Sequence, residues 1–159
     1  MRIIPMTEQF LAAAGVVHSA AWQQSHREIC TPEFVASHTP QRQTEYLRKE
    51  QQAGKKLWLL LDDTETAVGV VSLDKRGTMG IIENLYVLPA AQNRGFGTRL
   101  LRFAIQKCGT LYSRPVRPVL WVLSSNERAK RLYRRIGFAE TGRSKPLRSG
   151  LCEQEMALE

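Results

Sequence analysis

The sequence predicts an α/β fold around a mixed β-sheet, with its elements in the order β-αα-βββ-α-β-α-ββ. Apolar residues at three- and four-residue steps predict amphipathic helices, and short apolar runs bounded by turn residues predict strands. The runs at 57–61, 67–73 and 81–88 follow one another with only turns between them, as antiparallel hairpin strands do. An amphipathic stretch separates the runs at 81–88 and 116–123, which predicts a parallel crossover. A sheet with both kinds of connection is mixed.

The N-terminal part should be one short strand followed by helices. Residues 2–4 are apolar enough for the strand, and helical spacing of apolar residues begins at about Thr7. Thr31 and Thr39 can each cap a helix, and each precedes a proline that fits the first helical position, so both predict helix starts. The helix after Thr39 should end near Gly54, because glycine favours the left-handed C-terminal cap.

Turn residues set the remaining boundaries. Polar turns at 62–65 and 75–80 separate the three hairpin strands. Another amphipathic helix is expected over 126–136. Residues 138–158 should supply two more strands around a loop at 145–150.

Size and composition indicate one soluble domain. The chain has 159 residues, 43% of them hydrophobic and 24% charged, so we expect a single domain over residues 1–159. No apolar run approaches the roughly 18 residues that span a bilayer, and no signal-peptide core follows Met1. We therefore expect a cytoplasmic protein that does not enter a membrane. Cys30, Cys108 and Cys152 are far apart, so neither a disulfide framework nor a metal site is expected.

The formal net charge of +8 favours polyanionic partners such as nucleic acid, an anionic membrane or a phosphate-rich cofactor. Charge alone does not choose among them, and a basic surface can be merely solvated. The most basic run is Arg128, Lys130, Arg131, Arg134 and Arg135. It lacks the interleaved aromatic residues of single-strand binders, so we interpret it as a solvated helix face and expect no nucleic-acid partner.

A candidate phosphate site follows the strand at 81–88. The segment Gln92-Asn93-Arg94-Gly95-Phe96-Gly97-Thr98 forms a loop and then begins a helix. The first amides of a helix have no internal partner, the helix dipole adds positive charge, and glycines let a phosphate approach closely. Arg94 and Arg99 would add full charges. The glycines alone are also consistent with a tight turn and close helix packing, and neither a Walker P-loop nor a Rossmann fingerprint is present.

A second motif lies on the helix expected over 126–136. Its members are Asn126, Ala129, Tyr133, Gly137 and Phe138, at the spacing Asn-x2-Ala-x3-Tyr-x3-Gly-Phe. Asn126 suits a helix N-cap and suits a ligand contact equally well, while Gly137 suits the C-terminal cap. Tyr133 lies on the apolar face of the helix, but its hydroxyl needs a hydrogen-bond partner.

The two motifs, in this order and about thirty residues apart, resemble the GNAT superfamily of acyl-CoA N-acyltransferases. The resemblance is specific from Glu83 to Phe138, and the element order extends it to nearly the whole chain. It implies an N-acetyltransferase that moves an acetyl group from acetyl-CoA to a primary amine by direct attack, with no acyl-enzyme. It also implies a splay between the strands at 81–88 and 116–123, where the pantetheine arm lies. A catalytically silent acyl-CoA sensor of the same fold is the alternative.

The resemblance assigns cofactor contacts to both motifs. Backbone groups near Leu85, Tyr86 and Val87 would pair with the pantetheine arm as an added strand does. The pyrophosphate would be held by the amides of Gln92, Asn93, Arg94, Gly95, Phe96, Gly97 and Thr98. Asn126 would touch the cofactor arm, and Tyr133 would be the general acid that protonates the departing thiolate.

Glu83 is the candidate general base, since an amine attacks only when it is neutral. Similar family members carry a glutamate in a Glu-x-Leu/Phe-Tyr/Phe-Val setting, and strand alternation would put Glu83 on the same face as Leu85 and Val87. A salt-bridged glutamate at a strand edge is the alternative. Ribosomal-protein-type members have a glutamate where this chain has Trp121, which disfavours peptide N-terminal acetylation of that kind.

The acceptor pocket in such folds is built by the first two helices and the loop between the last two strands. The candidate acceptor contacts are Trp22, His26 and Glu153, with packing and a solvated strand position as the alternatives. Small amines, polyamines, amino acids and antibiotic amines all remain open as acceptors. Similar proteins are often homodimers, but nothing in the sequence shows one.

Overall fold

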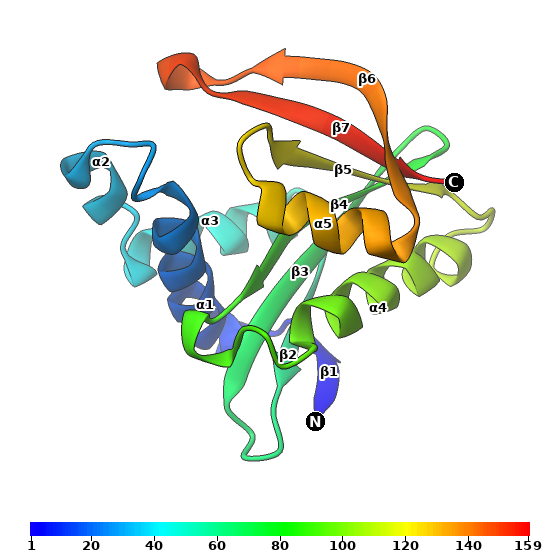
Figure 1. Ribbon diagram of the computed structural model, residues 1–159. Coiled ribbons are helices and arrows are strands. Elements are labelled where there is room, and N and C mark those ends of the chain that lie inside the picture. The colour runs from blue at the N-terminus through cyan, green and yellow to red at the C-terminus, as the bar shows by residue number, and fades with distance from the viewer.

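The computed structural model describes residues 1–159, apart from the side chain of Ser149. Seven strands form one sheet in the order β1-β2-β3-β4-β5-β7-β6 (Figure 1). The strands are β1 Arg2–Pro5, β2 Lys56–Leu61, β3 Ala67–Arg76, β4 Met79–Val87, β5 Arg117–Leu123, β6 Phe138–Pro146 and β7 Cys152–Leu158. Only β4 and β5 pair in parallel, so the predicted mixed sheet and the predicted crossover between these two strands are both confirmed.

Five α-helices connect these strands. They are α1 Glu8–His26, α2 Pro32–Ala36, α3 Pro40–Gln52, α4 Phe96–Thr110 and α5 Glu127–Ile136. Three helices rather than the expected two lie between β1 and β2, because each threonine cap begins a helix of its own. The Thr31 side chain accepts from the Phe34 amide at 3.3 Å, and that of Thr39 accepts from the Arg42 amide at 3.2 Å. None of the helices described is both long and apolar enough to cross a lipid bilayer.

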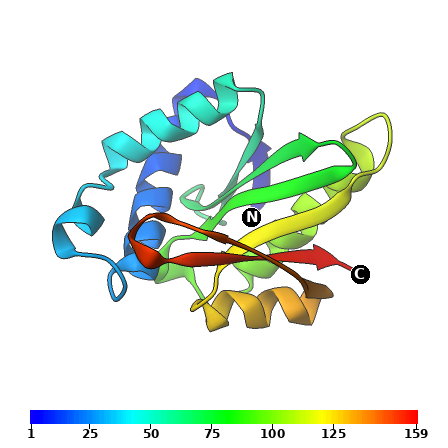
Figure 2. The same cartoon turned by 90° about the horizontal axis from the view of Figure 1, so that it is seen from above.

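Helices cover both faces of the sheet (Figures 1 and 2). On one face α1 and α3 bury Leu47 and Leu59, and on the other α4 and α5 bury Leu100 and Leu120. A strand that is buried on both faces has no polar face to alternate with, which explains the continuous apolar run at 57–61.

The sheet splits between its two parallel strands. Pairing between β4 and β5 runs only from Met79–Arg117 to Ile82–Leu120. Beyond Ile82, β4 pairs with β3 alone, and beyond Leu120, β5 pairs with β7 alone. Figure 1 shows the two strands diverging from there. The predicted splay is therefore confirmed.

A β-bulge lies on β4 where the splay begins. The β3–β4 register shifts between Val70 and Ser72, so that β4 has one extra residue, and Asn84 has a left-handed φ of 52°. Ile82 lies in the core under α4, which puts Glu83 on the opposite face, whereas Leu85 packs back against the α4 side. The expectation that Glu83 shares a face with Leu85 and Val87 is therefore wrong, because the bulge interrupts the alternation.

A buried chain of polar side chains holds this bulge. The Gln43 amide donates to Nδ1 of His18 at 2.9 Å, which leaves the ring proton on Nε2 to donate to Asn84 at 3.0 Å. Asn84 in turn donates to the Ser72 hydroxyl at 2.9 Å. The chain thereby links α3, α1, β4 and β3, and it fixes the one residue of β4 whose backbone is strained.

Candidate active site

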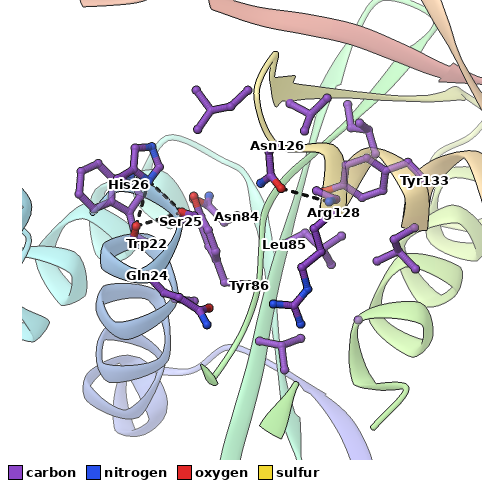
Figure 3. A pocket seen from close by; sticks show the side chains of 18 of the residues that line it. Trp22, Gln24, Ser25, His26, Asn84, Leu85, Tyr86, Asn126, Arg128 and Tyr133 are labelled. Atoms are coloured by element: carbon purple, nitrogen blue, oxygen red, sulfur yellow. Dashed lines mark hydrogen bonds between the residues drawn. The ribbon is translucent and has the colours of Figure 1, made fainter. Parts of the chain in front are cut away.

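A cavity of about 1210 Å³ occupies the gap between β4 and β5. It exceeds the roughly 300–1,000 Å³ typical of one small ligand, so it has room for two reactants. Its walls come from α1, β4, the turn before α4, β5 and α5 (Figure 3). The predicted site residues that line it are Trp22, His26, Glu83, Leu85, Tyr86, Val87, Gln92, Asn93, Gly95, Gly97, Thr98, Asn126, Tyr133 and Glu153.

Two predicted residues do not line this cavity. Phe96 is buried in the core, and the exposed Arg94 lays its guanidinium over the Phe96 ring at 5.2 Å. Arg99 instead donates to the Met1 carbonyl at 3.4 Å. The expected arginine charges are therefore not directed at the turn, and only the backbone amides of Arg94 and Phe96 remain available there.

The turn before α4 presents unpaired amides. Asn93 and Gly95 both have positive φ, 62° and 83°, and α4 begins directly after them. Among the described residues, none accepts a hydrogen bond from the amides of residues 93–98; the first paired amide is that of Arg99, to the Gly95 carbonyl at 3.0 Å. The first turn of α4 carries no acidic residue. Amides of this kind at a helix N-terminus form a ready anion site.

The open edge of β4 supplies further free backbone groups. The Leu88 amide donates to the Val68 carbonyl on β3 at 2.8 Å. Since alternate residues of an antiparallel strand direct their backbone groups to the same neighbour, Val87 and Leu85 direct theirs into the gap. The Gln92 side chain donates to the Val87 carbonyl at 3.0 Å, so Gln92 fastens the turn to β4. The amides of Val87 and Leu85 face the cavity.

The two polar residues of the second motif reach the same cavity from α5. Asn126 caps the helix, since its side-chain oxygen accepts from the Ala129 amide at 3.1 Å, and its amide nitrogen is left for other partners. Tyr133 is only 8% exposed, and burial raises the pKa of its phenol to about 12. Its hydroxyl bonds to no described residue. Every described polar side-chain atom that is fully buried has a hydrogen-bond partner, so the Tyr133 hydroxyl is not fully buried. The hydroxyl therefore opens into the cavity, as Figure 3 shows.

Glu83 is held by cations on the α1/α3 side. Lys55 donates to its carboxylate at 2.6 Å, and Arg76 lies 3.5 Å from it. Lys55 also bonds Glu50. The salt-bridged alternative thus describes the contacts of Glu83, although the residue borders the cavity as well.

Aromatic rings form the wall opposite Tyr133. Trp22 is stacked between His26 at 3.8 Å and His38 at 3.4 Å, which agrees with the packing alternative for Trp22 and His26. Burial lowers the pKa of His26, so its imidazole is neutral near pH 7. Glu153 on β7 pairs with Lys145 at 3.2 Å.

Sequence reasoning missed the three charged cavity residues on α5: Arg128, Arg131 and Arg135. They were assigned to a solvated face because helical spacing alone does not show which side of α5 meets the gap.

Comparison with known proteins identifies the family. A family model described as the acetyltransferase (GNAT) family matches residues 22–138. The chain belongs to the GNAT acetyltransferase family. No curated protein sequence matches this GNAT chain, but solved structures do.

Three solved structures share the GNAT fold over nearly the whole chain. A spermidine N-acetyltransferase from Vibrio cholerae has a TM-score of 0.72 at 17% identity, covering 99% of this chain and 94% of that one. A ribosomal-protein alanine N-acetyltransferase from Escherichia coli has a TM-score of 0.73 at 20% identity, with 99% and 92% covered. A PaiA N-acetyltransferase from Thermoplasma acidophilum, in complex with coenzyme A, has 0.69 at 16% identity, with 98% of each chain covered. The family uses acetyl-CoA.

Proposed function

We propose that this protein transfers an acetyl group from acetyl-CoA to a primary amine. One juxtaposition supports the proposal above all: the unpaired amides of residues 93–98, the open edge of β4 and the Tyr133 hydroxyl meet in one cavity. These groups fit a ligand with a diphosphate at one end, amides in its middle and a sulfur at the other end. When bound, acetyl-CoA supplies an acetyl group activated as a thioester.

The chain's own groups would bind and orient that ligand. The amides before and at the start of α4 hold the diphosphate oxygens, because their hydrogen atoms and the helix dipole both point at the site. The amides of Leu85 and Val87 pair with the pantetheine arm, as the earlier part of β4, Met79–Ile82, pairs with β5. The free side-chain nitrogen of Asn126 donates to the same arm. The Tyr133 hydroxyl donates a hydrogen bond to the sulfur as the thiolate departs.

The acceptor enters from the opposite, aromatic wall. We propose Trp22, His26 and Glu153 as its contacts, with the whole chain, residues 1–159, as one catalytic unit in the cytoplasm. The similar structures named for spermidine and for an alanine of a ribosomal protein both act on amines, which supports an amine-bearing acceptor. Trp121 lines the cavity on β5, where it meets Lys145 at 4.4 Å instead of offering a carboxylate.

Acetyl-CoA should raise the melting temperature of the purified protein. Incubation of the protein and acetyl-CoA with a panel of primary amines should release free thiol. At least one amine should gain about 42 Da, the mass added when an acetyl group replaces a hydrogen. Calorimetric melting and mass spectrometry measure the two effects. Stabilisation without any acetylated amine would favour the silent sensor. No stabilisation by acetyl-CoA would contradict the proposal as a whole.

Glu83→Gln should lower kcat/KM by on the order of tenfold or more below pH 8 if the carboxylate accepts the amine proton, because a protonated amine does not attack. The measurement is the pH–rate profile of the variant against that of the wild type. Glu50→Gln is the matched control, since it removes the other carboxylate bonded to Lys55 and lies outside the cavity lining. Equal losses in both variants would assign Glu83 to the ion-pair cluster rather than to proton transfer.

A further inference from the structure

The cations of α5 divide into two groups by their partners. Lys130 and Arg134 bond Glu127, and Arg134 also bonds Glu140. Arg128, Arg131 and Arg135 have no carboxylate within 4.0 Å among the described residues. All three line the cavity, whereas Lys130 and Arg134 do not. The uncompensated charges of this helix are therefore confined to its cavity side.

Helical geometry makes these three residues one stripe. Steps of three and four residues bring side chains to the same face of a helix, and like charges at such spacing repel each other. The arrangement therefore costs stability in the isolated protein, and an anion placed between the arginines would remove that repulsion. None of the described carboxylates supplies that anion.

The stripe begins at the candidate phosphate turn. Arg128 donates to the Asn93 side-chain oxygen at 3.0 Å, and this partner is neutral, so the guanidinium keeps its full charge. Figure 3 shows Arg128 extending from α5 into the gap. Arg131 and Arg135 continue from it toward the C-terminal end of α5. An anion bound by the stripe would thus lie close to a diphosphate bound at the turn, but as a separate group.

We propose that Arg128, Arg131 and Arg135 form a binding site for a phosphomonoester carried by the nucleotide end of the cofactor, the 3′-phosphate that distinguishes coenzyme A from dephospho-coenzyme A. This inference rests on the proposed function, since it assumes the diphosphate at residues 93–98. A phosphomonoester carries close to two negative charges and three acceptor oxygens, which suits several guanidinium groups better than one.

The test compares the binding of coenzyme A and dephospho-coenzyme A by isothermal titration calorimetry. The wild-type protein should bind coenzyme A about tenfold to a hundredfold more tightly, as expected for charge-assisted hydrogen bonds to one phosphate. The triple variant Arg128→Gln, Arg131→Gln, Arg135→Gln should lose this preference by binding coenzyme A more weakly, with its affinity for dephospho-coenzyme A changed far less. The preference should also shrink with added salt.

Arg134→Gln is the matched control, because it removes the same charge from the same helix at a position paired with Glu127 and Glu140. It should keep the wild-type preference. If the triple variant does not fold, the single variants Arg131→Gln and Arg135→Gln should each lose part of the preference. Equal binding of both ligands by the wild type would overturn this inference and leave the proposed function standing. Binding of neither ligand would overturn the proposed function itself.

Discussion

Replacing Tyr133 by phenylalanine is expected to lower kcat by on the order of a hundredfold while changing the affinity for coenzyme A by less than about threefold. The substitution removes only the hydroxyl and leaves the buried ring in contact with Phe138, 6.2 Å away between centroids. The fold and the cofactor contacts of the turn should therefore persist. Single-turnover kinetics with acetyl-CoA and an accepted amine, together with calorimetric binding of coenzyme A, separate the two effects.

The raised pKa of Tyr133 defines what its hydroxyl can do. At a pKa of about 12 the phenol is a weaker acid than a thiol, whose usual pKa is about 8.5, so it acts chiefly by hydrogen bonding to the sulfur as charge develops there. It also stays protonated up to strongly alkaline pH. Below about pH 10, the pH–rate profiles of the wild type and the phenylalanine variant should consequently have the same shape on the alkaline side. Full activity in that variant would remove Tyr133 from the chemistry.

Acidification from pH 6.5 to pH 4 is expected to cost about 3 kcal/mol of folding free energy through His18 alone. Burial lowers the pKa of His18 from 6.5 to about 4, and the hydrogen bond to Asn84 offsets only part of that effect. In this range the unfolded chain binds a proton at His18 that the native protein does not. Stability is therefore fully present above pH 6.5 and falls as the pH drops toward 4.

His18→Gln should remove this part of the pH dependence, so that the difference in unfolding free energy between wild type and variant shrinks on acidification. Urea denaturation at several pH values gives these free energies. Burial also lowers the pKa values of His26 and His38, and both proteins share those contributions. A difference that stays constant from pH 7 to pH 4 would show that His18 is protonated in the native state without penalty.

Local chemistry explains which features could be predicted from the sequence. The turn at residues 92–98 was predictable because positive φ at Gly95 and a helix start are properties of a few adjacent residues. The threonine caps are local in the same way. The cap at Thr31 predicted the start of α2, but the element order counted only two helices before β2, because five residues give too little periodicity to recognise a separate helix.

Long-range contacts explain what the sequence concealed. The bulge at Asn84 depends on His18, 66 residues away, and on Ser72 of the neighbouring strand, so strand alternation failed at Glu83. Arg94 contacts a ring only two residues away, that of Phe96, but the burial of this ring depends on how α4 packs against the sheet. The orientation of α5, which brings Arg128 to the gap, depends on packing that no local pattern encodes.

The short β4–β5 ladder has a mechanical consequence. Four residue pairs join a four-stranded block to a three-stranded block, and beyond them the blocks form an open wedge. A ligand that bonds to both blocks bridges this gap and takes the place of the absent hydrogen bonds between β4 and β5. Separation of the two blocks is then opposed by the free energy of ligand binding, so amide exchange near Leu85 and Val122 should slow when the ligand is bound.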